Sequence, residues 1–281
     1  MGKIKELSRE EFERMHMLQV DMVKELDRVC RANNINYVLS DGSLLGAVRH
    51  KGFIPWDDDV DVSMLREDYE KFRKVSNQLD PEICYFQDHG NEKEYRWGYG
   101  KLRRTGTKFV RVGQEHMTAR TGVFIDIFPL DDVPMSVPGQ ILQNFHAYCL
   151  RKIMYSEVGK VADDESKFAR FVYRNLAKID IDKVFKSFNK MAYKSRNSKP
   201  NRVRILAFPP TGAYYRKNPL KERYGMPKRW FLERAEYDFE GLKIYGTKAY
   251  DEFLSYEYGD YMKLPPEDQR DPHAPVSEYY F

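Results

Sequence analysis

Apolar residues near the start of the chain recur at the spacing of an α-helix. The segment Ser8-Arg9-Glu10-Glu11 has the form of a capping box, and an apolar face follows it at Met22, Leu26, Val29 and Cys30. This pattern predicts an amphipathic helix that ends near residues 33–34, and then a short strand over 36–40. A second helix is predicted to begin at the turn Gly42-Ser43 and to run through Arg49.

Acidic and apolar residues alternate in the segment 56–62, which reads Trp-Asp-Asp-Asp-Val-Asp-Val. Asp59 and Asp61 are separated by Val60 and followed by Val62, which is the period of a half-buried β-strand. We therefore expect both valines to face a core. Both aspartates are expected to face one point on the opposite side of the strand.

The next part of the chain carries shorter patterns. A helix is predicted over 67–79, and strands of an antiparallel extension are predicted around Tyr85, Lys101 and Phe109. The apolar run 123–128 predicts a further strand, which Pro129 is expected to close. Asp126 is the single charge within that run. A carboxylate in an apolar strand needs a partner, which makes it a candidate functional residue.

From about residue 138 the pattern turns helical through 197, with a break expected near 161–165. From residue 200 onward, frequent Pro, Gly and aromatic residues predict short strands and loops. We predict one α+β domain over 1–281, with a mixed sheet flanked by helices. It is divided into a core over 12–135, a helical subdomain over about 136–199 and an aromatic-rich C-terminal wrap over about 200–281.

The composition is ordinary for a soluble globular protein, with 32% charged and 42% apolar residues. A net charge of +4 is too small to indicate nucleic acid as a partner. The charge is unevenly distributed, because residues 194–234 hold 12 Lys or Arg against two Glu. This basic block suits contact with an anionic polymer or a membrane surface. A solvated charged face is the alternative of equal weight.

The number and spacing of the cysteines and the lengths of the apolar runs indicate the cellular compartment of the protein. Cys30, Cys84 and Cys149 are widely spaced and form no CxxC pair, so we expect reduced thiols. The first residues, Met-Gly-Lys-Ile-Lys-Glu, lack the apolar core of a signal peptide. No apolar run approaches the ~18 residues that a membrane span requires. These features predict a cytoplasmic protein, with peripheral contact at the inner face of the membrane as an option.

The four carboxylates in 57–61 repel one another, by roughly 1 kcal/mol per pair in water and by several times more near a protein surface. A bound cation neutralises such a cluster. Oxygen ligands without a nearby His or Cys suit Mg²⁺, with Mn²⁺ as the alternative. Asp59 and Asp61 are the predicted ligands. Asp57 shares their parity and is predicted to join or support them, whereas Asp58 is expected to point the other way if the strand begins that early.

Two other features complete a constellation with this strand. The Gly42-Ser43 turn at a helix N-terminus offers backbone N–H groups and a hydroxyl to phosphate oxygens. Asp126, on a neighbouring strand, can complete the metal shell or accept the proton of an attacking hydroxyl. Each signal is weak alone, because Gly-Ser pairs are usually turns and Asp-x-Asp is usually surface. Their order and spacing together are far more specific.

Cationic side chains near these motifs are candidates for binding phosphate. Lys101 and Arg103 share one face of their predicted strand, whereas Arg104 lies on the other face, so we favour the first two. Arg49 lies one to two turns into the helix that begins at Gly42 and is a further candidate. A solvated strand edge or helix face is the structural alternative for all of them.

The order of Gly-Ser, Asp-Val-Asp-Val and Ile-Asp-Ile resembles the pattern of the DNA-polymerase-β-like nucleotidyltransferase superfamily. Longer stretches are similar to the LicD family, and these are residues 40–50, 52–62, 124–131 and 258–266. The resemblance extends from about residue 12 to about residue 275 and is weakest in the helical middle. It implies a nucleotidyltransferase-like fold, with Asp59 and Asp61 at the positions of the family's metal-binding pair.

The resemblance also implies a reaction. LicD proteins move phosphocholine from CDP-choline to a sugar hydroxyl on teichoic acid or lipopolysaccharide, and the related fukutin-related proteins move ribitol phosphate. Nothing in this chain matches the zinc-binding insertion of the latter, which favours the bacterial branch. The implied acceptor is a lipid-linked or anionic glycan. Asp126 is our choice for the general base, with metal ligation as its competing role.

Alternatives to this interpretation remain. Other CDP-linked donors, such as ribitol or glycerol phosphate, fit the same motifs. A non-catalytic scaffold is disfavoured, because the three aspartates of the constellation are all present. A choline headgroup requires aromatic faces, and Trp97, Tyr99 and Trp230 are candidates to supply them. His273 follows a Pro-Pro stretch and is a further candidate for substrate contact.

Overall fold

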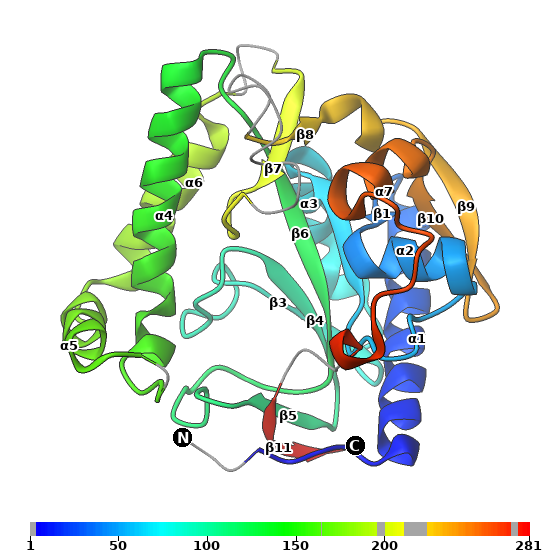
Figure 1. Ribbon diagram of the computed structural model, residues 1–281, viewed down its shortest axis with the longest axis horizontal. Coiled ribbons are helices and arrows are strands. Elements are labelled where there is room, and N and C mark those ends of the chain that lie inside the picture. The colour runs from blue at the N-terminus through cyan, green and yellow to red at the C-terminus, as the bar shows by residue number, and fades with distance from the viewer. Residues whose placement is uncertain (1–3, 164, 196–199, 211–223, 271–274) are drawn as a thin grey trace.

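A mixed sheet crosses the centre of the molecule (Figure 1). The computed structural model describes residues 4–163, 165–195, 200–210, 224–270 and 275–281. In sheet order the central strands are β3 (Cys84–Gln87), β4 (Gly100–Arg104), β6 (Phe124–Asp132), β2 (Asp61–Leu65), β1 (Val38–Leu39), β10 (Leu242–Thr247) and β9 (Arg234–Phe239). The sheet continues from β6 through β7 (Arg202–Ile205) and β8 (Met226–Pro227), while β5 (Lys108–Arg111) pairs separately with β11 (Val276–Tyr280).

Helices flank this sheet in two groups, which confirms the predicted arrangement. One group holds α1 (Arg9–Ala32), α2 (Asp41–His50), α3 (Arg66–Val75) and α7 (Tyr250–Tyr258). The other stands apart at the left of Figure 1 and holds α4 (Val137–Gly159), α5 (Lys167–Leu176) and α6 (Ile181–Tyr193). Across the described ranges, no helix combines the length and the apolar character that crossing a membrane requires.

The first helix begins as its sequence predicts. The Ser8 hydroxyl accepts a hydrogen bond from the Glu11 N–H, and the Glu11 carboxylate accepts one from the Ser8 N–H, at 3.2 and 2.8 Å. One buried polar residue on α1 then anchors two other segments. Gln19 Nε2 donates to the backbone oxygens of Asp58 and Phe124, at 2.9 and 3.1 Å. The helix therefore ties the acidic segment to the start of β6.

Strand register brings the predicted acidic residues together. β2 and β6 are parallel, with Asp61 opposite Asp126, and β4 is antiparallel to β6, with Lys101 opposite Asp126. Val60 and Val62 are fully buried, as the alternation predicts. The strand itself begins at Asp61, so Asp59 lies in the loop before it. Ser43 explains this start, because its hydroxyl accepts the N–H of Asp61 at 2.8 Å.

One predicted boundary was wrong. β6 does not close at Pro129 but continues to Asp132, with Pro129 opposite Met64 of β2. On the edge of β6 that faces away from β2, pairing with β4 ends at Ile127 and pairing with β7 begins at Leu130. Pro129 lies between these two ladders, so the N–H that proline lacks is not needed for a hydrogen bond on that edge. The helical middle breaks at the predicted place, between α4 and α5, and also between α5 and α6.

The buried apolar residues form two clusters. The larger one joins α1 and α2 to the sheet, with residues such as Leu26, Val62 and Ile127 fully buried. The smaller one lies in the helical group, where Leu150 and Met154 of α4 pack with Phe188 of α6. The division into core, helical subdomain and C-terminal wrap stays a prediction. The free thiols of Cys30 and Cys84 are buried, and that of Cys149 is half-buried.

Candidate functional site

Three carboxylates meet where β2 and β6 lie side by side. Asp59, Asp61 and Asp126 each present an oxygen, and these three oxygens lie within 4.8 Å of one another. The parallel register supplies the contact between Asp61 and Asp126, and the Asp126 N–H donates to the Val60 oxygen at 2.8 Å. We call these three residues the acid trio. Their spacing and their oxygen-only chemistry fit a hard divalent cation.

Burial and mutual repulsion raise the pKa of two members of the acid trio, Asp59 and Asp61. Burial raises the pKa of Asp59 to about 8, and nearby carboxylates, of which Asp58 is the strongest, act in the same direction. The Asp59 side chain is 21% exposed, so solvent screens part of this shift. Burial also raises the pKa of Asp61 well above its usual range, and the charges of Asp59 and Asp41 add to it. A divalent cation would relieve this repulsion.

β2 begins only at Asp61, so the condition under which Asp58 would point away from Asp57 and Asp59 is not met. Oxygens of Asp57, Asp58 and Asp59 lie within 4.8 Å of one another. The strict alternation of a strand does not apply here, because residues 57–60 precede β2. Asp57 is therefore not placed by strand parity either. Its backbone oxygen instead accepts a hydrogen bond from His16 Nε2 at 2.8 Å.

The turn at the start of α2 positions the backbone and side chains next to the acid trio. A Cβ on Gly42 would lie 2.5 Å from Asp57 Oδ2, so only glycine allows this carboxylate to approach. Ser43 is 3% exposed, and its hydroxyl accepts a hydrogen bond from the backbone of β2. Gly42 lines a cavity of about 700 Å³ beside the acid trio, whereas Ser43 does not line it. Arg49 lines the same cavity and donates to the Tyr261 oxygen at 3.1 Å.

Lys101 and Arg103 of β4 share one face, as predicted. Lys101 Nζ forms a buried ion pair with Asp126 Oδ1, and burial lowers the pKa of this lysine despite its partner. Arg103 donates to Gln87 Oε1 at 2.8 Å and to the Gly122 oxygen at 3.0 Å. Arg104 points the other way and donates to the Ile83 oxygen.

Two residues at the site were not predicted. Asp41 has a left-handed backbone, with φ of 47°, and lines two cavities with Asp59 and Asp61. The position of Asp41 directly before Gly42 was the one feature of the sequence that could have indicated a role at this site. Arg111 at the end of β5 places Nη2 3.6 Å from Asp59 Oδ2 and 4.0 Å from Asp58 Oδ2. No local sequence pattern indicates a role for Arg111, because it lies on a strand that is distant in sequence from Asp59.

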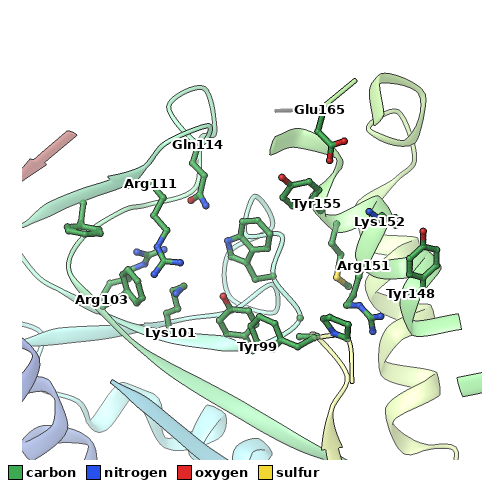
Figure 2. A pocket seen from close by; sticks show the side chains of 18 residues that line it. Tyr99, Lys101, Arg103, Arg111, Gln114, Tyr148, Arg151, Lys152, Tyr155 and Glu165 are labelled. Carbon is green, nitrogen blue, oxygen red and sulfur yellow. The ribbon is translucent and has the colours of Figure 1, made fainter. Parts of the chain in front are cut away.

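On another side of the acid trio, one cavity adjoins the three carboxylates and leads to a second cavity. One has a volume of about 360 Å³ and is lined by all three carboxylates together with Tyr99 and Arg111. The second has about 580 Å³ and lies between β4, β5 and α4 (Figure 2). Tyr99 and Arg111 line both cavities, so the second continues from the first. We call the larger one the lateral cavity.

The aromatic residues predicted to bind a choline headgroup lie in two different environments. Trp97 and Tyr99 line the lateral cavity. Trp230 is 5% exposed, packs on Phe253 and lines none of the cavities described above, so it belongs to the core. His273 lies outside the described residues.

Comparison with known proteins places these residues in a known domain. Residues 34–157 match the family model described as LicD/FKTN/FKRP, nucleotidyltransferase domain, so the match includes the whole acid trio. The lipopolysaccharide cholinephosphotransferase LicD of Haemophilus influenzae is 29% identical over 256 residues, which cover 90% of this chain and 91% of that protein. The ribitol 5-phosphate transferase FKRP of Homo sapiens is 52% identical over 40 residues, which cover 14% of this chain and 8% of that protein.

Proposed function

Because this chain belongs to the LicD family, we propose that it transfers phosphocholine from CDP-choline to a sugar hydroxyl of a lipopolysaccharide- or teichoic-acid-type glycan. The observation that carries this proposal is the acid trio, which joins Asp59, Asp61 and Asp126 at one point within the matched residues. We assign the fold to the DNA-polymerase-β-type nucleotidyltransferases. The parallel contact of β2 with β6 supports this assignment, because it places the acids on adjacent strands.

Mg²⁺ is the proposed cofactor, with Mn²⁺ as the alternative. Asp59 and Asp61 would hold it, and Asp57 is close enough to Asp59 to assist. The raised pKa values of Asp59 and Asp61 fit this role, because each carboxylate lacks sufficient compensating charge from the protein. When bound, the ion would neutralise charge on the donor pyrophosphate.

The protein's own residues would orient the reactants and move one proton. The acceptor oxygen forms a bond to the phosphorus that carries choline, and the bond from that phosphorus to the CMP oxygen breaks. Asp126 is our choice to receive the hydroxyl proton, because Lys101 engages Oδ1 and leaves Oδ2 for it. The competing role is metal ligation. Asp126→Asn separates the two roles, since Mg²⁺ binding is retained if Asp126 is only the base and is weakened if it is a ligand.

The cavity with Gly42 and Arg49 is our proposed site for the CMP end of the donor. It opens on Asp59 and Asp61, and Lys263 adds a second cation to its lining. Arg103, predicted from the sequence to clamp phosphate, lies on the other side in the lateral cavity. Lys101 is already paired with Asp126, so its proposed contact with phosphate is shared with that carboxylate.

Release of CMP from CDP-choline tests this function directly. We expect Mg²⁺-dependent release that EDTA abolishes, and a loss of at least about a thousandfold in Asp61→Asn. Glu13→Gln, an exposed acid on α1, is the matched control and should retain full activity. Equal activity in Asp61→Asn and Glu13→Gln would overturn the metal site, whereas absence of CMP release from the wild-type protein would favour a non-catalytic scaffold.

Transfer of ribitol phosphate or glycerol phosphate is the second candidate. The match to FKRP favours it over 40 residues, whereas the match to LicD extends over 90% of the chain and favours phosphocholine. CDP-choline, CDP-ribitol and CDP-glycerol should therefore be compared side by side. A preference for either polyol donor would contradict the main proposal.

We further propose a cytoplasmic protein that contacts the inner face of the membrane peripherally. Much of the basic block 194–234 lies outside the described residues, at 196–199 and 211–223. Among the described residues, α5 is the best candidate for this contact. Phe168 and Phe171 are 77% and 62% exposed, and Arg170 and Arg174 accompany them on this short helix. Phe168→Ser with Phe171→Ser should reduce binding to anionic vesicles, and unchanged binding would exclude this surface.

A further inference from the structure

The lateral cavity is lined by strands on one wall and by a helix on the other. In Figure 2, Lys101, Arg103 and Arg111 stand on the strand wall, opposite Arg151 and Tyr155 of α4. Its volume of about 580 Å³ lies within the ~300–1,000 Å³ that small-molecule sites occupy. The cavity therefore has room for a ligand of one or two sugar rings.

Positive charge dominates the lining of this cavity. Five cationic side chains line it, against the single acid Glu165, and they are Lys101, Arg103, Arg111, Arg151 and Lys152. Three of them surround the ring of Phe124, with charged groups 3.5, 4.9 and 5.2 Å from its centroid.

Several of these cations have only neutral hydrogen-bond partners. Arg103 donates to an amide and a carbonyl oxygen, and Arg151 donates to the Leu206 oxygen at 3.0 Å. The buried Arg111 Nε has no hydrogen-bond partner among the described residues. Lys152 donates to the Tyr173 hydroxyl at 2.8 Å. Arg111 is also paired with Asp59 and Asp58, whereas Arg103 is buried with neutral partners alone, so an anion in this cavity would stabilise the charge of Arg103 most.

An occupant of the lateral cavity would reach the reacting atoms. Tyr99, Arg111 and Phe208 line both this cavity and the one that holds the acid trio. The cavity with Gly42 and Arg49 is separate from the lateral cavity and also opens on Asp59 and Asp61. The site thus has two approaches, one for each of two substrates.

We propose that the lateral cavity binds the acceptor, and that this acceptor is an anionic saccharide that carries a phosphate or carboxylate near its reacting hydroxyl. The inference rests on the proposed function, because it assigns the acceptor of that same reaction. Arg103, Arg151 and Lys152 hold the anion, and Lys101 and Arg111 add positive charge that they share with Asp126 and Asp59. The faces of Trp97, Tyr99 and Tyr155 pack on the apolar faces of the sugar. The same cations exclude the quaternary ammonium of the donor.

Binding of simple sugars by isothermal titration calorimetry tests this proposal. The probes are glucose 6-phosphate, glucuronic acid and neutral glucose, each added to the full chain with Mg²⁺ and CMP. Glucose 6-phosphate and glucuronic acid distinguish the two sources of charge, and at least one should bind about tenfold or more tightly than glucose. Equal binding of all three sugars would overturn the proposal.

Variants on the helix wall locate the anion. Arg151→Gln and Lys152→Gln should each weaken binding of the charged sugar by about tenfold and change CMP binding less than twofold. Arg151→Lys keeps the charge and should retain most of the affinity. Lys183→Gln removes an exposed charge from α6, outside the lateral cavity, and should behave as wild type. Loss of CMP binding with retained sugar binding would assign the cavity to the donor instead.

The two proposals fail in different ways. CMP release from CDP-choline without an acceptor measures the proposed function, and the control Lys183→Gln should retain it. If that release is intact but charged and neutral sugars bind alike, only the acceptor proposal is wrong. If the wild-type protein releases no CMP, the proposed function fails, whereas the selectivity of the cavity for anions is still measured.

Discussion

The ammonium group of Lys101 on β4 and the carboxylate of Asp126 on β6 form a buried ion pair. The two residues are direct neighbours across the sheet, and Asp61 of β2 is the neighbour of Asp126 on the other side. One row across three strands therefore reads Lys101, Asp126, Asp61. The middle carboxylate lies between a fixed cation and the proposed metal position.

This arrangement predicts how Lys101→Met changes the stability of the protein with and without Mg²⁺. Removing the ammonium leaves Asp126 buried without its partner, which should destabilise the protein by about 3–5 kcal/mol. Mg²⁺ should restore part of that loss, because it supplies positive charge beside the same carboxylate. Urea unfolding with and without Mg²⁺ measures both effects. Lys101→Arg, which keeps the charge, should lose less stability, and an equal loss in both variants would point to packing rather than charge.

Asp61→Asn should separate stability from activity. The substitution removes a carboxyl that is costly to ionise in this buried cluster, so we expect the metal-free protein to keep or raise its midpoint of unfolding. Stabilisation by Mg²⁺ should disappear in the variant, because a proposed ligand is lost. Thermal unfolding over a series of Mg²⁺ concentrations measures this. A variant that is still stabilised as strongly as wild type would rule out Asp61 as a ligand.

The raised pKa of Asp59 predicts how stability depends on pH. An unfolded aspartate has a pKa near ~4, whereas the folded value is about 8, so between these values the folded protein holds more protons than the unfolded chain. Without a metal ion, this group should make stability fall as pH rises through that window. Mg²⁺ binding must displace the proton, so the affinity should rise with pH, by up to about tenfold per unit. Urea unfolding between pH 5 and 8, with and without Mg²⁺, tests both signs, and a Mg²⁺ affinity independent of pH would contradict the shift.

Local patterns were sufficient to predict much of this site. Helix α1 and its capping box could be predicted because adjacent residues make those hydrogen bonds. The burial of Val60 and Val62 followed from their period, and the shared face of Lys101 and Arg103 followed in the same way. The convergence of the three aspartates was inferred from motif order and family resemblance, since no local signal states that β2 pairs with β6.

Long-range pairing accounts for what the sequence did not predict. Arg111 approaches Asp59 because β5 pairs with β11, whose sequence lies more than 160 residues away. Asp58 turns toward its neighbours because Gln19 of α1 holds its backbone in a loop rather than a strand. Trp230 packs in the core because α7 covers it. Each outcome depends on a contact between segments distant in sequence.

The close approach of Gly42 to Asp57 yields a final prediction. A Cβ at Gly42 would lie 2.5 Å from Asp57 Oδ2, so Gly42→Ala must displace this carboxylate or shift the start of α2. We expect a loss of stability of about 1–3 kcal/mol and a lower rate of CMP release. In an Asp57→Ala background the obstacle is absent, so Gly42→Ala should then cost much less.

The coupling between the two substitutions, measured by urea unfolding of the four proteins in a double-mutant cycle, should exceed about 0.5 kcal/mol. Additive effects would show that Gly42 acts through the helix backbone and not through Asp57. If the coupling is present in stability but Asp57→Ala alone leaves CMP release intact, then Asp57 shapes the turn and Asp59 and Asp61 hold the metal without it.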